Sequence, residues 1–184
     1  TPYDHPDRYG PDKLISLQQP RHPTVEAYRR LRTNLQYAHV DAPLRSLMVT
    51  SSGVNEGKSL TAANLAIVLA QSGLSVILVD ADLRRSRQHS LFDLDKRPGL
   101  AEAILAEEVA PFLRSPGVNV PNLRLLTAGE SVPFPAEILG SQKMQHLLAQ
   151  LGKAADFVIV DTPPVLAVTD AQLVGRLADG ALLV

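Results

Sequence analysis

The chain has 184 residues, of which 45% are hydrophobic and 20% are charged, and its formal net charge at pH 7 is -1. This size and composition suit one globular domain, and the near-zero net charge provides no overall attraction to nucleic acid or to an anionic membrane. The chain has no cysteine, which excludes disulfides, thiolate catalysis and cysteine metal sites. We expect no nucleic-acid partner.

Residues 1–23 hold five of the chain's 14 prolines and show little periodicity. This pattern predicts an extended lead-in or linker. Apolar residues then recur at spacings of three and four from Val25 to Leu35, which predicts a helix over 24–40. The chain begins at Thr1 and ends within a predicted strand, so we expect it to be a piece of a longer protein.

Short apolar runs alternate with helical patterns in the rest of the chain. In chain order the sequence predicts a strand at 45–50, a helix at 59–72 ended by Gly73, a strand at 74–80, a helix at 99–108, a strand at 122–129, a helix at 135–151, a strand at 156–164, a helix at 169–178 and a strand at 180–184. Continuous apolar strands of this kind are buried on both faces. Residues 24–184 are therefore predicted to form an α/β domain, a doubly wound, mostly parallel sheet with helices on both faces.

The segment between the strand at 45–50 and the helix at 59–72 reads SSGVNEGKSL, residues 51–60. Glycines let such a loop curl its N–H groups around an anion at a helix N-terminus, a lysine reaches the β- and γ-phosphates, and a hydroxyl binds Mg²⁺. The residues expected to bind the phosphates of a nucleotide are Gly53, Val54, Asn55, Glu56, Gly57, Lys58, Ser59 and Leu60. The usual G-x-x-x-x-G-K-[ST] pattern places its first glycine at Ser52, so one glycine is missing. The alternative is a helix N-terminus that happens to carry Gly-Lys-Ser.

Two further strands end in aspartate, at Asp80 and Asp161. Ligands bind beyond the carboxyl ends of parallel strands, so both carboxylates should lie beside the phosphate loop. We predict that Ser59, Asp80 and Asp161 hold Mg²⁺, partly through water. Asp82 is placed to position or deprotonate a nucleophile. The alternative is that each aspartate only caps the following helix.

Three arginines follow Asp82, at Arg84, Arg85 and Arg87. Such residues stabilise the charge of a phosphoryl-transfer transition state or bind an acidic partner. We predict a catalytic role for Arg84, which is nearest to the acids, together with Lys58, Asp80 and Asp82. A solvated basic turn is the alternative for Arg85 and Arg87.

Together these motifs resemble those of the bacterial tyrosine kinases of capsular and exopolysaccharide assembly, the BY-kinases, over residues 24–184. SSGVNEGKS is similar to their Walker A motif, VILVDADLR to their Walker A′ motif and FVIVDTPP to their Walker B motif. EAYRRLRTNLQYA resembles their E-x-x-R-x-x-R helix, which here falls on Glu26, Arg29 and Arg32. The resemblance implies a P-loop NTPase fold of the Min/Par-like, deviant Walker type, with a kinase domain at 24–184 that is incomplete at its C-terminal end.

The resemblance also implies an activity and partners. It implies ATP- and Mg²⁺-dependent tyrosine phosphorylation, chiefly between subunits of a homo-oligomer such as a ring, with Asp82 activating the tyrosine hydroxyl. It further implies regulation of polysaccharide polymerisation and export, a membrane copolymerase or activator that is fused or separate, and a cognate tyrosine phosphatase. The expected location is cytoplasmic, at the inner face of the plasma membrane. Glu26, Arg29 and Arg32 are expected at the subunit interface; the alternative is a local Glu–Arg pair on a solvated helix face.

Two features depart from the family pattern. Family members usually end in a tyrosine cluster, but the four tyrosines here all lie in the first 37 residues, at Tyr3, Tyr9, Tyr28 and Tyr37. The family often has Asn where this chain has Phe134.

Two other functions remain open. One is a Min/Par-like ATPase, a class with a signature lysine at the position that Gly53 occupies here. The other is an ATP-binding regulatory scaffold that transfers no phosphate to tyrosine.

Overall fold

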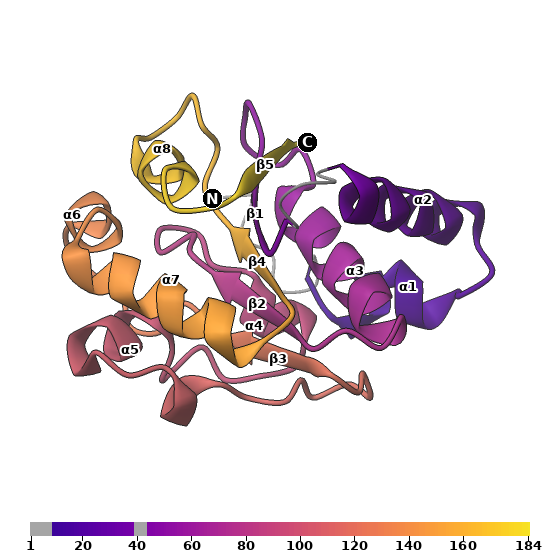
Figure 1. The fold of residues 1–184 in the computed structure, drawn as a ribbon, viewed down its shortest axis with the longest axis horizontal. Coiled ribbons are helices and arrows are strands. Elements are labelled where there is room, and N and C mark those ends of the chain that lie inside the picture. The colour runs from indigo at the N-terminus through magenta and orange to yellow at the C-terminus, as the bar shows by residue number, and fades with distance from the viewer. Residues whose placement is uncertain (1–8, 39–43) are drawn as a thin grey trace.

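The computed structural model describes residues 9–38 and 44–184, and its centre is a single parallel sheet (Figure 1). The strands run in the order β3-β2-β4-β1-β5, and every neighbouring pair is parallel. The strand bounds are β1 Ser46–Thr50, β2 Val76–Asp80, β3 Leu123–Leu126, β4 Phe157–Asp161 and β5 Gly180–Leu183. The predicted parallel α/β fold is confirmed.

Helices cover both faces of the sheet. On one face lie α1 (Ile15–Gln18), α2 (Pro23–Tyr37), α3 (Lys58–Gln71) and the short α4 (Gln88–Leu91), with a 3-10 turn, η2 (Pro11–Lys13), ahead of them. On the other lie α5 (Leu100–Ala106), the 3-10 turn η3 (Ala110–Phe112), α6 (Pro135–Leu139), α7 (Gln142–Ala154) and α8 (Asp170–Gly175). Right-handed crossovers between parallel strands require such an arrangement of helices.

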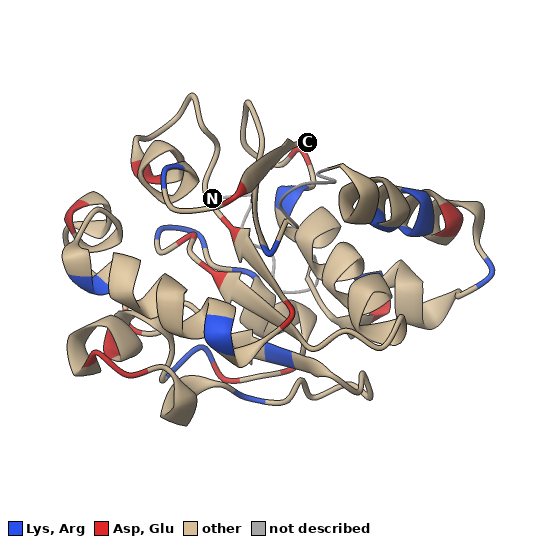
Figure 2. Ribbon diagram, viewed as in Figure 1, with Lys and Arg blue, Asp and Glu red and all other residues tan. Residues whose placement is uncertain are grey.

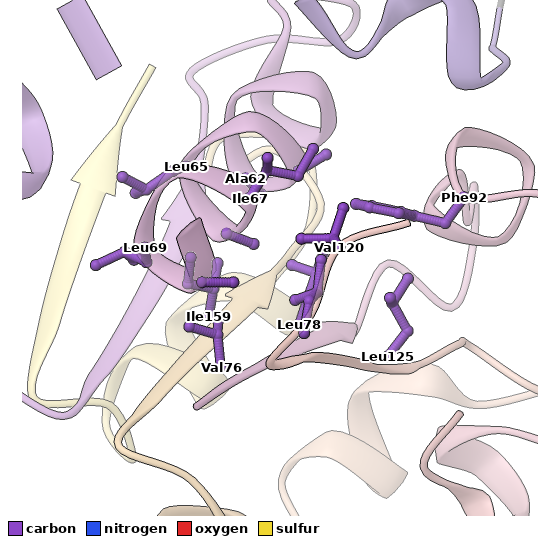
Figure 3. Close-up of a cluster of buried hydrophobic side chains, with 14 of the residues drawn as sticks. Ala62, Leu65, Ile67, Leu69, Val76, Leu78, Phe92, Val120, Leu125 and Ile159 are labelled. Carbon is purple, nitrogen blue, oxygen red and sulfur yellow. The ribbon is translucent and has the colours of Figure 1, made fainter. Parts of the chain in front are cut away.

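Each central strand contributes to two cores because its side chains alternate between the two faces. Val76 and Leu78 of β2 pack in the cluster that contains α3, which Figure 3 shows from close range. Ile77 and Val79 pack in the opposite cluster, with side chains of α5 and α7. This two-sided burial explains why these strands read as continuous apolar runs.

The helix predicted over 135–151 is two helices. Helix α6 ends before Gly140, and α7 begins after Ser141, whose Oγ accepts the backbone N–H of Met144 at 3.2 Å. A serine that caps a helix in this way starts a new helix and changes the direction of the chain. The helix predicted over 24–40 begins at Pro23 and ends at Tyr37, and its residues 39–40 lie outside the described residues.

The segment predicted as an extended lead-in is not extended where the structure describes it. It forms η2 and α1, and Leu14 between them is fully buried in the cluster around α3. The backbone N–H of Ser16 donates to Oδ1 of the buried Asn64 in α3, at 2.9 Å. Leu14 and Asn64 thus attach this segment to the helix that follows the phosphate loop. The division of the chain at residue 24 stays a prediction.

Replacing Leu14 with alanine tests this attachment. Burial of a leucine side chain predicts that Leu14→Ala lowers the free energy of unfolding by about 2–5 kcal/mol. Urea denaturation measures the loss, and Leu105→Ala is the matched control, because Leu105 is 72% exposed and should change stability by about 0.5 kcal/mol or less. Equal effects of the two substitutions would show that the segment is not part of the folded unit.

Candidate active site

The phosphate loop connects β1 to α3 at the carboxyl end of the sheet. Two of its residues have left-handed backbones, Asn55 with φ 63° and Gly57 with φ 96°. Gly57 immediately precedes α3, and a Cβ at this position would meet nothing within 4 Å. Glycine is therefore required here by backbone conformation and not by lack of space.

Glu56 folds back onto its own loop. Its carboxylate accepts the backbone N–H of Gly53 at 2.7 Å and the hydroxyl of Ser52 at 3.0 Å. These hydrogen bonds, that of Gly53 first, lower the pKa of Glu56. Glu56 was predicted to bind the nucleotide, but in the structure its side chain binds the loop itself. It stabilises the turn at Ser52, the position where the usual first glycine is missing.

Lys58 is the first residue of α3, and its ammonium group lies among the predicted catalytic residues. Nζ donates to Oδ2 of Asp82 at 2.8 Å and to Oγ of Ser59 at 3.3 Å, and it lies 4.0 Å from Oδ1 of Asp161. Burial lowers the pKa of Lys58, but Asp161 and Asp82 outweigh it and leave this pKa above its ordinary value. Lys58 is therefore a cation that neutralises the carboxylates around it.

Asp161 ends β4 and is fully buried. Oδ2 accepts the side-chain amide of Gln88 at 2.9 Å, whereas Oδ1 is buried and has no hydrogen-bond partner within the described chain. Burial is the main cause that raises the pKa of Asp161, and Lys58, Gln88 and Ser59 oppose it. A buried carboxylate oxygen without a donor is suited to bind a cation.

These residues fit Mg²⁺. The orphaned Oδ1 of Asp161 and the hydroxyl of Ser59 are hard oxygen donors, and Mg²⁺ in phosphate sites needs only one or two protein ligands besides water and substrate. No group of three or more acidic, His or Cys side chains placed to hold a metal is found in residues 9–38 and 44–184. The geometry therefore fits a site completed by water and phosphate oxygens.

Asp80 ends β2 and is occupied by backbone donors. Its Oδ2 accepts the N–H groups of Arg87 and Gln88, both at 3.0 Å, and its Oδ1 accepts that of Asp82 at 3.3 Å. Burial, followed by the charges of Asp161 and Asp82, raises the pKa of Asp80 to about 8. Asp80 holds the loop that follows β2, and its role as a metal ligand stays a prediction.

The structure separates the three arginines. Arg84 donates to both carboxylate oxygens of Asp170, at 2.8 and 3.0 Å, and Asp170 is buried at the start of α8. Arg85 and Arg87 instead line the cavity above the phosphate loop. The catalytic role predicted for Arg84 stays a prediction, and its bidentate pair attaches the loop after β2 to α8.

The cavity above the loop has a volume of about 210 Å³. Its charged lining consists of the cations Lys58, Arg85 and Arg87 and one acid, Asp82. The remaining lining residues are Tyr9, Val54, Asn55, Gly57, Ser59, Leu60 and Pro164. In Figure 2 the tips of β2 and β4 are red, and the loop after β2 carries both blue and red. An excess of cations beside backbone N–H groups suits a polyphosphate.

Sequence reasoning missed Tyr9 and Gln88. Gln88 donates its side-chain amide to the carbonyl of Ser59 and to Asp161, both at 2.9 Å, and so connects α3 to β4. No motif marks Gln88 in the sequence. Tyr9 lies in the predicted lead-in, and only the burial of this segment brings it to the cavity.

The residues predicted for a subunit interface lie on α2. Glu26 and Arg29 pair with each other at 3.3 Å on the surface, and Arg29 also donates to the carbonyl of Pro20. Arg32 donates to the carbonyl of Val68 in α3 at 3.4 Å. The local Glu–Arg pair is present, and the interface stays a prediction. Phe134, immediately before α6, is 65% exposed.

A parallel sheet with a phosphate loop after β1 and acids after β2 and β4 defines a P-loop NTPase of the ParA type. A family model described as the ParA-group NUBPL iron-transfer P-loop NTPase matches residues 44–184. The septum site-determining protein MinD of Pyrococcus horikoshii has a similar fold, with a TM-score of 0.64 and 22% identity over 76% of this chain and 57% of that chain.

Comparison with individual proteins narrows the class. Tyrosine-protein kinase YwqD of Bacillus subtilis is 44% identical over 93% of this chain and 72% of its own length. The kinase domain of the Escherichia coli tyrosine kinase ETK matches with a TM-score of 0.87 and 37% identity, covering 93% of this chain and 67% of that chain. Tyrosine-protein kinase wzc of Salmonella typhimurium is 35% identical over 96% of this chain, which covers 24% of that protein. The chain belongs to the bacterial tyrosine-protein kinases, and the predicted protein-tyrosine kinase activity is confirmed at the level of the family.

Replacing Asp161 with asparagine tests the cation site. In the parent chain we expect Mg²⁺ to tighten binding of ADP, and in Asp161→Asn we expect this gain to fall by about tenfold or more, because changes around a metal site commonly cost that much. Titration of a fluorescent ADP analogue with and without Mg²⁺ measures the effect. An unchanged Mg²⁺ gain in the variant would exclude Asp161 as a ligand.

Asp80 should behave differently. Asp80→Ala leaves the part-buried N–H of Arg87 and the buried N–H of Gln88 without an acceptor, and each such loss costs about 1–3 kcal/mol of folding free energy. Relief of the unfavourable burial and repulsion of the Asp80 charge offsets only part of this cost. Thermal or urea unfolding without nucleotide or Mg²⁺ measures this loss. A variant as stable as the parent chain would show that Asp80 does not hold the loop.

Proposed function

We propose that the chain transfers the γ-phosphoryl group of ATP to tyrosine hydroxyls at the cavity above the phosphate loop. The observation that carries this assignment is the position of the Lys58 ammonium group between two aspartates. It lies 2.8 Å from Oδ2 of Asp82, which lines the cavity, and 4.0 Å from Oδ1 of Asp161, a buried oxygen without a hydrogen-bond partner in the described chain. Phosphoryl transfer requires mainly positioning and charge neutralisation, which such a group supplies.

The phosphate loop binds and orients the polyphosphate. Backbone N–H groups at the start of α3 and the ammonium of Lys58 neutralise its β- and γ-oxygens. Arg85 and Arg87 line the same cavity and add positive charge where the transferred group develops negative charge. Val54, Asn55 and Leu60 form the rest of the loop-side wall.

Asp82 lies at the cavity and accepts the proton of the tyrosine hydroxyl. Its Oδ2 is paired with Lys58 at 2.8 Å, so the same ammonium group connects the base to the phosphate site. Ser59 and Asp161 would hold Mg²⁺, which supplies further neutralisation of the β- and γ-phosphates. Asp80 supports this arrangement from behind by fixing the loop that carries Asp82.

The setting proposed for the whole protein is capsule or exopolysaccharide polymerisation and export. Its partners would be a membrane copolymerase or activator, fused or separate, further copies of the chain in a ring joined through Glu26, Arg29 and Arg32, and a cognate tyrosine phosphatase. This chain covers 24% of the kinase wzc but 72% of the kinase YwqD, so the relatives leave both the fused and the separate form open. The proposed location is the inner face of the plasma membrane. Within the described residues, no helix is long and apolar enough to cross a membrane.

Replacing Lys58 with methionine tests the transfer. Loss of a preorganised cation at a transferred group predicts that phosphorylation of a tyrosine-containing peptide falls by about 10²–10³-fold or more. The assay uses Mg-ATP with phosphotyrosine detection, with and without the cytoplasmic segment of the activator. Lys153→Met at the end of α7 is the matched control and should retain the activity.

Phosphate released to water by the parent chain, with no phosphotyrosine even when activator is present, would contradict the proposal. That result would favour a Min/Par-like ATPase. Nucleotide binding without transfer or hydrolysis would favour a regulatory scaffold. Thermal unfolding of Lys58→Met must accompany the assay, because the substitution leaves the buried Asp82 without its cation.

A further inference from the structure

A tyrosine lines the same cavity as the phosphate loop. The phenol ring of Tyr9 packs against the core beside α3, and the guanidinium of Arg87 lies 4.5 Å from the centre of the ring. A cation at this distance attracts the face of an aromatic ring. A potential phosphate acceptor is thus held beside Lys58 and Asp82, which are also in the cavity lining.

The position of Tyr9 follows from the attachment of its segment to α3. The backbone N–H of Lys13 donates to the carbonyl of Gly10, and that of Leu14 to the carbonyl of Pro11, so the chain between Tyr9 and Leu14 is compact. Leu14 is then buried against α3, the helix that begins at Lys58. Helix α1, which follows Leu14, lies beside α3 (Figure 1).

The other described tyrosines lie elsewhere. Tyr28 packs against the core around α3, where burial raises its pKa and its hydroxyl is hydrogen-bonded to Thr61. Tyr37 is 76% exposed at the end of α2, next to Gln36, which lines a hollow at the amino ends of the strands. Tyr3 lies outside the described residues. Exposure therefore favours Tyr37 as a substrate, whereas proximity to the phosphate loop favours Tyr9.

We propose that Tyr9 is an acceptor of the phosphoryl group that this chain transfers, an inference that rests on the proposed function. The hydroxyl oxygen of Tyr9 attacks the γ-phosphorus of ATP on the phosphate loop. A bond forms between these two atoms while the bond from the γ-phosphorus to the β,γ-bridging oxygen breaks. ADP leaves, and the phenolic proton passes to the carboxylate of Asp82.

The product is also favoured by the charge of the cavity. Phosphotyrosine adds a charge of about -1.5 to -2 at pH 7, and Arg85 and Arg87 are in the lining beside Tyr9. Arginine binds such a group through parallel N–H···O bonds. Arg85 and Arg87 therefore add positive charge to the cavity in which the phosphorylated side chain would lie.

The test maps the phosphorylated residues of the full chain. The chain is incubated with Mg-ATP and a random copolymer of glutamate and tyrosine, and mass spectrometry assigns phosphate in the chain while the copolymer reports transfer to an external tyrosine. We expect phosphate on Tyr9, its absence in Lys58→Met, and incorporation into the chain that falls to background in Tyr9→Phe. Tyr37→Phe, the matched control at an exposed tyrosine, should incorporate as much as the parent chain.

Failure of this inference and failure of the proposed function give different results. Phosphorylated copolymer with no phosphate on Tyr9, or with the chain's phosphate confined to Tyr3, Tyr28 or Tyr37, would overturn the role of Tyr9 and leave the kinase assignment standing. Absence of phosphotyrosine from both copolymer and chain would overturn the proposed function, and the role of Tyr9 with it.

Discussion

Two buried carboxylates at the ends of adjacent strands determine the rest of the site. Asp80 of β2 and Asp161 of β4 are partners in the parallel ladder and are both fully buried. Burial disfavours ionisation of both groups and raises the pKa of each, and the charge of Asp161 adds to this effect at Asp80. The sheet can retain this pair only because surrounding groups compensate for it.

Three kinds of group stabilise the two carboxylates: backbone N–H groups, a side-chain amide and an ammonium group. Backbone N–H groups at Arg87 and Gln88 bind Asp80, which fixes the loop after β2. The amide of Gln88 binds one oxygen of Asp161, and Lys58 lies 4.0 Å from the other. The one oxygen left without a donor lies behind the phosphate loop. The arrangement that stabilises the acids thus also includes the groups proposed to bind the cation and the phosphates.

Features that depend on local sequence could be predicted, and features that depend on tertiary packing could not. The parallel strands were predictable because burial on both faces requires continuous apolar runs, and Gly57 because a left-handed backbone favours glycine. The two-helix structure of 135–154 was missed because Gly140 and Ser141 were treated as helix interior, although serine is a strong N-cap.

The site residues divide in the same way. Lys58, Ser59, Asp82 and Asp161 follow strand ends, and the topology of a parallel sheet brings such positions together without further information. The partners of Arg84 and the position of Tyr9 depend on packing between elements far apart in the chain. Arg84 was predicted to be catalytic because it lies close to Asp80 and Asp82 in the sequence. In the structure it pairs with Asp170, which lies 86 positions further along the chain.

The segment before α2 contributes a residue, Tyr9, to the lining of the candidate active site. A P-loop domain defined from its motifs alone starts near the helix at 24–40, yet Leu14 and the Ser16–Asn64 hydrogen bond make the preceding residues part of the core beside α3. One wall of the cavity, at Tyr9, therefore belongs to that segment. Asn64 and Lys58 are on the same helix, so the segment that carries Tyr9 is bonded to the helix that begins at the phosphate loop.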